Sequence, residues 1–313
     1  MDYAKLIIGL IFLTGGAHFL VEGSKNLALK LNIRPIIVGL TIVAMATSFP
    51  ELLVSLTSAL KGSDGMAVGN IVGSNIANIA LVLAIAALVR PFKVKKQTLK
   101  VDFPVLLGTT ILFCCFVLDK ELNWVEGITL LIILVGYIFY CIKTSAHKPD
   151  FQNEKPHGSK LKNLIFILAG SAVVIAGACF LVAGGVEIAR NYNISKAVIG
   201  LTVFAVGTSL PELAATVTAA VKDQNEIGMG NIIGSNIFNF ALVIGIVPIV
   251  LKLKNNTVLR FELINIDIVV MVACVGILYL IILKTGKFGR IAGMFFLLGY
   301  LMYVTYCYKP EIF

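Results

Sequence analysis

Two glutamates occupy the middle of long apolar segments. Glu51 ends ATSFPE at residues 46–51, and Glu212 ends GTSLPE at residues 207–212. No lysine or arginine falls in the middle of either segment, and a charge at the centre of a bilayer costs about 2.5 to 3.5 kcal/mol on insertion scales. Each carboxylate therefore needs a cation, which must be a proton or a metal ion.

A proline directly precedes each glutamate and adds candidate ligands. Proline lacks an N–H and disturbs the hydrogen bonds of the preceding helical turn. At membrane depth, carbonyls without partners are tolerated only where they are satisfied again or line a polar cavity, and a bound cation can satisfy them. The candidate ligands in these turns are the carbonyls of Ala44, Thr47, Ala205 and Thr208 and the hydroxyls of Ser48 and Ser209.

Two asparagine-rich segments, GNIVGSNIANIA at 69–80 and GNIIGSNIFNFA at 230–241, add a polar stripe. The pairs that lie four residues apart, and so share a helix face, are Ser74 with Asn78 and Ser235 with Asn239. The glycines have the GxxxG spacing that lets membrane helices pack closely. We expect this packing, at Gly69, Gly73, Gly230 and Gly234, to bring the stripe near the glutamates.

All of these candidate ligands are oxygen atoms, and none belongs to cysteine or histidine. Oxygen-only sites suit hard cations such as Ca²⁺ and Na⁺, and two carboxylates balance one divalent ion. Mg²⁺ fits less well because it retains its waters and demands octahedral geometry. His18, alone in the first apolar segment, is more typical of a packing or interfacial residue than of a ligand.

An internal repeat relates the two halves of the chain. Residues 39–85 align without gaps to residues 200–246 at an offset of 161, with 24 identities in 47 positions. Generic hydrophobicity explains matched leucines and isoleucines, but it does not explain the matched Thr, Ser, Pro, Glu and Asn. The halves are therefore repeats that share their polar residues.

The repeat predicts an all-α polytopic membrane protein with ten transmembrane helices arranged as two inverted five-helix repeats. Ten apolar segments are expected at 4–24, 35–60, 66–89, 103–119, 125–143, 163–189, 195–221, 227–251, 265–284 and 289–308. Five is an odd number, so the second half enters the membrane in the opposite orientation, as in many secondary transporters. We divide the chain into residues 1–142, a cytoplasmic linker at 143–162, and residues 163–313.

Composition agrees with an integral membrane protein. The chain has 313 residues, 58% hydrophobic and 14% charged, whereas soluble domains carry about 25% charged residues. Of the 26 basic residues, 17 fall after odd-numbered segments, which places those loops in the cytoplasm and both termini outside. We expect a plasma-membrane location in contact with lipid, and no nucleic acid, cofactor or obligate protein partner.

The paired motifs ATSFPE with GSNIAN and GTSLPE with GSNIFN resemble the sodium/calcium exchanger family of the cation/calcium exchanger superfamily, in its prokaryotic ten-span form. The resemblance implies an antiporter that exchanges Ca²⁺ for Na⁺ by alternating access. It implies that Glu51 and Glu212 are shared central ligands, and that the first and sixth segments form a gating pair.

The resemblance also implies roles for the neutral ligands. The Thr47 and Thr208 carbonyls would complete a Ca²⁺ site. One flanking Na⁺ site would use Ser48, Ser74 and the Ala44 carbonyl, and the other would use Ser209, Ser235 and the Ala205 carbonyl. Asn78 and Asn239 would line the middle.

Two residues depart from the family pattern. Ala46 stands where the family usually has glycine, as Gly207 does in the second repeat. Asn239 stands where several relatives have aspartate, which leaves two carboxylates and resembles potassium-independent exchangers.

A Ca²⁺/H⁺ or other cation/proton antiporter is the alternative function, although neither asparagine-rich motif carries the glutamate of the proton-coupled branch. An ion channel is a function of a different class, and ion flux through a channel would need no counter-ion. An enzyme is disfavoured because no nucleophile–base pair or phosphate loop is found.

Overall fold

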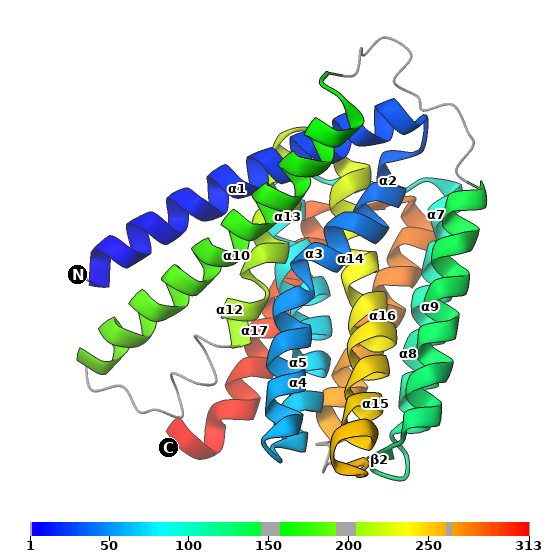
Figure 1. Ribbon diagram of the computed structural model, residues 1–313. Helices are drawn as coiled ribbons and strands as arrows, with labels where there is room; N and C mark the ends of the chain where they lie inside the picture. Colours follow the sequence, from blue (N-terminus) through cyan, green and yellow to red (C-terminus); the bar gives the residue numbers. More distant parts are fainter. Residues whose placement is uncertain (1, 145–156, 192–204, 261–264, 313) are drawn as a thin grey trace.

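The computed structural model describes residues 2–144, 157–191, 205–260 and 265–312. The described chain is almost entirely helical (Figure 1). Six helices surround the segments that carry the glutamates: α1 (Asp2–Leu31), α8 (Asp102–Phe116), α9 (Trp124–Thr144), α10 (Lys160–Asn191), α16 (Asn265–Thr285) and α17 (Arg290–Ile312). Short α7 (Lys96–Lys100) precedes α8.

Four interrupted helical segments carry the site. The first comprises α2 (Pro35–Val38), the π-helical turn η1 (Gly39–Val43), α3 (Ala44–Thr47) and α4 (Phe49–Leu60). The second comprises α5 (Asp64–Ala77), η2 (Asn78–Leu83) and α6 (Ala84–Val89). Their counterparts are α12 (Ala205–Thr208) with α13 (Leu210–Val221), and α14 (Asn225–Phe238), η4 (Asn239–Val243) and α15 (Ile244–Asn255).

Within the described ranges, eight helices are long and apolar enough to cross a membrane, and the bent pair 35–60 would be a ninth. The seventh predicted segment, 195–221, is the one not counted here, and it is described only from residue 205 onward. Two predicted segments were too short: α1 continues to Leu31 instead of residue 24, and α10 runs from Lys160 to Asn191. The division of the chain at 142 and 163 stays a prediction.

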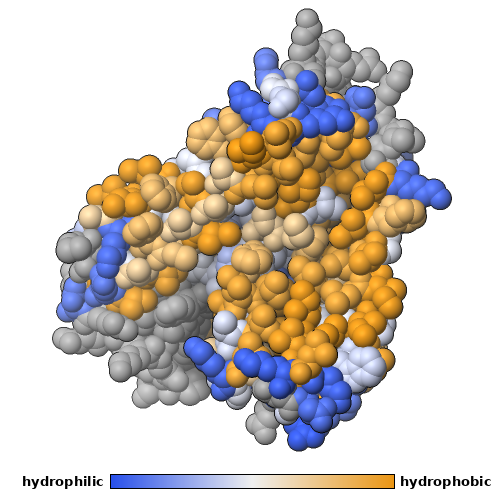
Figure 2. Space-filling model, viewed as in Figure 1, coloured by the Kyte–Doolittle hydropathy of each residue, from blue (hydrophilic) through white to orange (hydrophobic). Residues whose placement is uncertain are grey.

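The surface has an apolar belt with hydrophilic groups above and below it (Figure 2). Large side chains on the outer face of α9 are exposed, including Ile132, Val135 and Phe139. Exposure of such residues around the molecule suits contact with lipid rather than water. The chain is an integral, multi-pass membrane protein.

The helices alternate between two ends of the molecule. We call the end where α9 stops and α10 starts the linker side, and the opposite end, where α4, α15 and α17 stop, the terminal side (Figure 1). On the linker side, β1 (Phe92–Lys93) pairs antiparallel with β4 (Lys287–Phe288). On the terminal side, β2 (Glu121–Leu122) pairs with β3 (Leu259–Arg260). Each ribbon joins one strand from each half of the chain.

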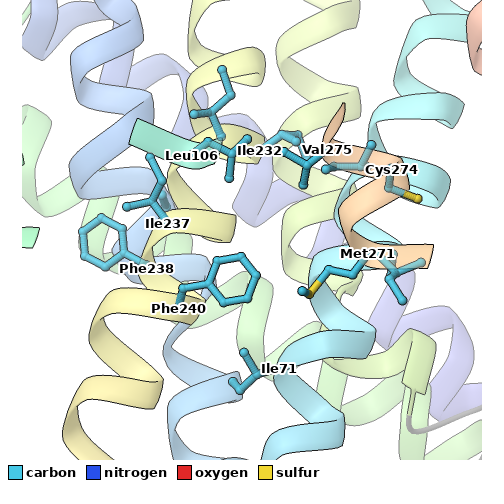
Figure 3. Packing of buried hydrophobic residues seen from close by; sticks show 14 of the residues in the cluster. Ile71, Leu106, Ile232, Ile237, Phe238, Phe240, Met271, Cys274 and Val275 are labelled. Carbon is cyan, nitrogen blue, oxygen red and sulfur yellow. The ribbon is translucent and has the colours of Figure 1, made fainter. Parts of the chain in front are cut away.

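The core lies between the site helices and the helices behind them. Phe240 of η4 is fully buried and packs against Phe113 of α8, with ring centroids 5.0 Å apart. Figure 3 shows Phe240 among Ile71, Ile237 and Met271. This packing holds α14 and η4 in a fixed position against α8 and α16.

Two matching hydrogen bonds brace the outer helices. The Tyr137 hydroxyl donates to Asp102 at 2.9 Å, joining α9 to α8. The Tyr303 hydroxyl donates to Asp267 at 2.7 Å, joining α17 to α16. Each aspartate lies in the first turn of its helix, where a carboxylate is favoured by the helix dipole.

Helices α1 and α10 form an antiparallel pair that crosses the bundle obliquely (Figure 1). A Cβ added at Gly9 would lie 2.8 Å from the Gly177 carbonyl oxygen, and one at Gly16 would lie 2.8 Å from the Gly170 oxygen. Only glycine permits backbones to approach this closely. The two contacts exchange places under the offset of 161, so the pair has the same pseudo-symmetry as the repeats.

Candidate functional site

The helix is broken at the same point in both repeats. Ser48 separates α3 from α4 with φ −83° and ψ 4°, and Ser209 separates α12 from α13 with φ −88° and ψ 3°. The first break bends its segment by 41°. Each proline then occupies the second position of the new helix, where its missing N–H costs nothing. The prolines therefore start helices at mid-membrane.

The break does not leave the Ala44 carbonyl unpaired. This oxygen accepts hydrogen bonds from the Ser48 N–H at 2.9 Å and from the Thr47 hydroxyl at 3.4 Å. The expectation that the proline frees this carbonyl is therefore wrong, because proline removes the partner of the carbonyl four residues before it, at position 46. Binding an ion would require Ala44 to give up or share these bonds. Ala205 is the first residue of α12, and its side chain is not among those that the structure describes.

Both glutamate side chains are completely buried. Glu212 Oε1 accepts hydrogen bonds from the hydroxyls of Ser48 and Ser235, each at 3.4 Å. Within the described residues, Glu212 Oε2 and both carboxylate oxygens of Glu51 have no partner. None of the ion pairs found there includes either glutamate. Each carboxylate thus lies in the protein interior without a counter-ion.

Thr47 connects the two repeats beside Glu212. Its hydroxyl donates to Asn231 Oδ1 at 3.1 Å and lies 3.3 Å from the Ser235 hydroxyl. Asn231 in turn donates to the Thr216 hydroxyl at 3.0 Å. Among the described residues, the buried hydroxyls of Ser209 and of Thr208, the counterpart of Thr47, have no hydrogen-bond partner. The site is therefore asymmetric in this conformation.

The first repeat has its own version of the asparagine contact. Asn70 donates to the Ser55 hydroxyl at 3.0 Å and to the Glu51 carbonyl at 3.3 Å. Asn70 and Ser55 are the counterparts of Asn231 and Thr216. In both repeats an asparagine holds the helix that follows the break.

Asn78 and Asn239 are fully buried at the first residue of π-helical turns η2 and η4. A π-turn inserts one residue into the helix and commonly marks a functional site. Asn239 donates to Asn75 Oδ1 at 3.3 Å, which links η4 of the second repeat to α5 of the first. Both amide atoms of Asn78 and Oδ1 of Asn239 have no partner among described residues.

Sequence reasoning missed Asn75 and Asn236 as site residues. Both side chains are buried, and Asn75 contacts Asn239 across the repeats. Their identity in the two GSN motifs was the available signal. Ser74 is also buried on α5, as predicted for a residue of the polar stripe.

The close packing expected at the glycines is confirmed at Gly230 and Gly234. A Cβ on Gly234 would lie 2.5 Å from the Leu40 carbonyl oxygen, and one on Gly230 would lie 2.5 Å from the Ile36 oxygen. The first segment therefore crosses directly over α14. At Gly69 and Gly73 no described atom lies within 4 Å of an added Cβ, and the expected close packing stays a prediction there. Their counterpart contacts would fall at 197–201, outside the described residues.

A cavity of about 460 Å³ approaches the site from the terminal side. Thr208, Pro50 and Pro211 form its inner end, and Val182 and Glu187 of α10 form part of its wall. On the linker side, α1 instead packs against α13, and Val21 is completely buried in a cluster with Ala215. In the described part of the chain, the cavity therefore leads to the site from the terminal side only.

The unpartnered atoms fit cation binding. Buried polar atoms in proteins are nearly always hydrogen-bonded, yet several carboxylate, hydroxyl and amide oxygens on the broken and π-helical segments have no partner among the described residues. The unpartnered oxygens belong to Glu51, Glu212, Thr208, Ser209, Asn78, Asn236 and Asn239. Oxygen donors of this kind coordinate Ca²⁺ and Na⁺, and a bound cation would satisfy them together.

Comparisons with known proteins point in the same direction. A family model described as "Sodium/calcium exchanger protein" matches residues 2–143 and 162–309. The chain is 38% identical over 294 residues to a putative antiporter, CaxA, of Alkalimonas amylolytica, covering 91% of each chain. It is 31% identical over 287 residues to the sodium/calcium exchanger MaX1 of Methanosarcina acetivorans, covering 79% of this chain and 82% of that protein.

The fold also matches solved structures. The sodium-calcium exchanger NCX_Mj soaked with Na⁺ and Sr²⁺ has a TM-score of 0.84 at 32% identity, with 97% of each chain covered. The same protein soaked with zero Na⁺ and Ca²⁺ also has a TM-score of 0.84, with 98% of each chain covered. The overall backbone therefore matches both soaking conditions equally well.

Proposed function

Because the chain belongs to the sodium/calcium exchanger family and is a transporter rather than an enzyme, we propose that it is an antiporter exchanging Ca²⁺ for Na⁺. The observation that carries this proposal is the pair of buried glutamates without counter-ions, surrounded by unpartnered oxygens. Two carboxylates neutralise one Ca²⁺, and the neutral oxygens on either side can hold Na⁺ when Ca²⁺ has left.

The ligands would divide between the ions as follows. Glu51 and Glu212, with the Thr47 and Thr208 carbonyls, would bind Ca²⁺. One Na⁺ would lie near Ser48, Ser74 and the Ala44 carbonyl, and another near Ser209, Ser235 and the Ala205 carbonyl. Asn78 and Asn239 would line the centre. In this arrangement Na⁺ and Ca²⁺ compete for the same carboxylates, so the two ions cannot occupy the site fully at once.

The basic residues support an orientation in the plasma membrane. Basic residues on the linker side include Arg90, Lys93, Lys95, Lys96, Lys100 and Lys222, which belong to the 17 that follow odd-numbered segments. Cytoplasmic loops are enriched in such residues. With the linker side in the cytoplasm, both termini and the cavity beside Glu187 would face the outside.

Ion flux in proteoliposomes tests the coupling. Vesicles loaded with Na⁺ and diluted into Na⁺-free buffer are expected to accumulate ⁴⁵Ca²⁺, and vesicles without a Na⁺ gradient are not. A proton ionophore should leave the uptake unchanged. Uptake driven by a pH gradient but not by Na⁺ would establish the alternative Ca²⁺/H⁺ antiporter, in which the unpaired glutamates carry protons. Uptake without any counter-ion would indicate a channel.

Asn239→Asp is expected to make ion binding depend on pH. The new carboxylate would lie where Oδ1 has no partner, and it would lose the amide donor that now contacts Asn75. A third acid should raise the apparent affinity for Ca²⁺ at high pH, and protonation should remove that gain as the pH falls. Initial ⁴⁵Ca²⁺ uptake between pH 6 and 9 measures this. Identical profiles for the variant and the native protein would mean that residue 239 faces away from the ions.

A further inference from the structure

The two repeats differ at a close contact beside a glycine. A Cβ added to Gly207 would overlap the Cγ2 methyl of Val182, so a side chain at residue 207 would force Val182 or α10 to shift. The offset of 161 relates Gly207 to Ala46 and Val182 to Val21. The first repeat therefore keeps the valine but carries a methyl group where the second repeat has none.

This difference matters when the repeats exchange conformations. In inverted-repeat transporters the second state arises when one repeat takes up the arrangement of the other around a fixed site. Helix α1 would then lie against α3 as α10 now lies against α12. The Ala46 methyl would occupy the space that the Val21 methyl requires, and overpacking of this kind destabilises an arrangement. No such overlap opposes the present conformation.

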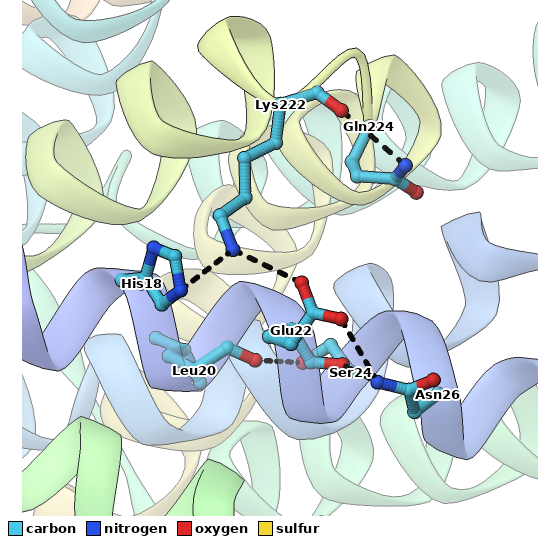
Figure 4. Close-up of polar contacts among 7 residues, drawn as sticks. All are labelled: His18, Leu20, Glu22, Ser24, Asn26, Lys222 and Gln224. Carbon is cyan, nitrogen blue, oxygen red and sulfur yellow. Dashed lines mark hydrogen bonds and ion pairs between the residues drawn. The ribbon is translucent and has the colours of Figure 1, made fainter. Parts of the chain in front are cut away.

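A second difference stabilises the present conformation directly. On the linker side, Lys222 after α13 contacts two residues of α1: its Nζ lies 3.0 Å from Glu22 Oε2 and 3.2 Å from His18 Nε2 (Figure 4). Asn26 donates to the other oxygen of Glu22 at 3.1 Å. We call Lys222, Glu22 and His18 the linker-side latch.

The latch is not repeated at the matching positions on the terminal side, where Glu187 of α10 instead pairs with Lys5 of α1 at 2.7 Å. The offset relates Lys222 to Lys61, His18 to Cys179 and Glu22 to Ala183. Closing the terminal side would bring α10 toward α4 without an acidic partner for Lys61 on α10 at this position. A polar contact therefore holds the linker side closed, and nothing at the matching position would hold the terminal side closed.

We infer that Ala46 and the linker-side latch act as positioning residues that make the two transport conformations unequal, favouring the one open on the terminal side. This inference rests on the proposed alternating access. Ala46 destabilises the opposite conformation, and the latch stabilises the present one. Neither the Ala46 methyl group nor any latch side chain is among the proposed ion ligands, so their effect should appear as a shift in population rather than as a loss of ligands.

Two thiols can report the two conformations in the full chain. Native Cys179 lies in the wall of the terminal-side cavity. Ala215→Cys places a second thiol at a residue that is buried on the linker side and whose counterpart, Val54, lies in the terminal-side cavity wall. The rate at which a water-soluble maleimide modifies each thiol is measured by mass spectrometry of the peptides, in detergent and without ion gradients.

Ala46→Gly, made together with Ala215→Cys, is expected to speed modification of the introduced thiol by about threefold or more and to slow that of Cys179. Ala46→Ser is the matched control, because it keeps the Cβ atom and should leave both rates unchanged. Unchanged rates in Ala46→Gly, or equal acceleration by Ala46→Ser, would overturn the role of the methyl group.

The latch is tested separately. Glu22→Ala gives the linker side the residue of its counterpart, and it is expected to accelerate modification of the thiol from Ala215→Cys. Lys61→Met is the control, because Lys61 is exposed and is the counterpart of Lys222. No acceleration by Glu22→Ala, or the same acceleration by Lys61→Met, would remove the latch from the inference.

A third variant tests the same contact in a way that does not depend on the folding of Ala46→Gly. Gly207→Ala puts a methyl group under Val182 and is expected to slow modification of Cys179 without any change at position 46. An unchanged rate would contradict the proposed contact. Because modification requires no Na⁺ or Ca²⁺ gradient, these results can stand even if the flux experiment identifies H⁺ as the coupling ion.

Discussion

Glu51→Gln and Glu212→Gln are each expected to reduce Na⁺-driven Ca²⁺ uptake by about 100-fold or more. Removing one of two buried carboxylates would leave a divalent ion with an uncompensated charge, and breaking a buried charge pair costs roughly 3 to 5 kcal/mol. Glutamine keeps the shape of the side chain, so Ser48 and Ser235 can still donate to the remaining oxygen at position 212. Initial ⁴⁵Ca²⁺ uptake into Na⁺-loaded proteoliposomes measures the effect.

The variants should fold at least as well as the native protein. A buried carboxylate without a counter-ion is costly in the empty protein, and neutral glutamine removes that cost. The expected pattern is therefore lost transport with an unchanged or higher melting temperature. Glu121→Gln is a suitable control, because Glu121 is a partly exposed residue paired with Arg260 at the terminal side. Normal uptake in either buried variant would reject these residues as ion ligands.

Gly234→Ala is expected to destabilise the protein and to impair transport. The added methyl group would lie 2.5 Å from the Leu40 carbonyl oxygen and 2.6 Å from Ala44 Cβ, so the first segment must move away from α14. Overpacking typically costs about 1 to 3 kcal/mol. The movement would also displace Ser48 from Glu212, since Ser48 directly follows the helix that contains Ala44.

Thermal unfolding followed by size-exclusion chromatography measures the loss of stability. Gly136→Ala is the matched control, because Gly136 is exposed on α9 and no described atom lies within 4 Å of an added Cβ. We expect a lower melting temperature for Gly234→Ala only. Equal melting temperatures for the two variants would show that the crossing of η1 over α14 is looser than the contact at Gly234 indicates.

The sequence predicted the helices and the meeting of the four polar segments because both follow from local patterns. A long apolar run must be helical in a bilayer, and the repeated Pro-Glu pair marks a break in each repeat. The repeat then requires Glu51 and Glu212 to share one site. The structure brings Ser48, Ser235 and Glu212 into contact, as expected for such a site.

Other features depend on contacts between distant residues, which a local sequence pattern does not identify. The π-turns at Asn78 and Asn239 arise from how these helices pack, and their residues do not differ from those of an ordinary helix. GxxxG spacing shows that a close approach is possible at Gly73 and Gly234 but not which helix makes it. The bond from Tyr137 to Asp102 joins residues 35 apart in sequence, so no periodicity reveals it.

The ribbons β1–β4 and β2–β3 have a consequence for the biogenesis of the protein. Strands β1 and β2 belong to the first half, whereas their partners at 259–260 and 287–288 are synthesised near the end of the chain. During translation, β1 and β2 therefore remain unpaired at opposite surfaces of the bilayer until their partner strands have been synthesised. The first half alone cannot complete either ribbon, so a truncated product would insert in the membrane but lack the final assembly step.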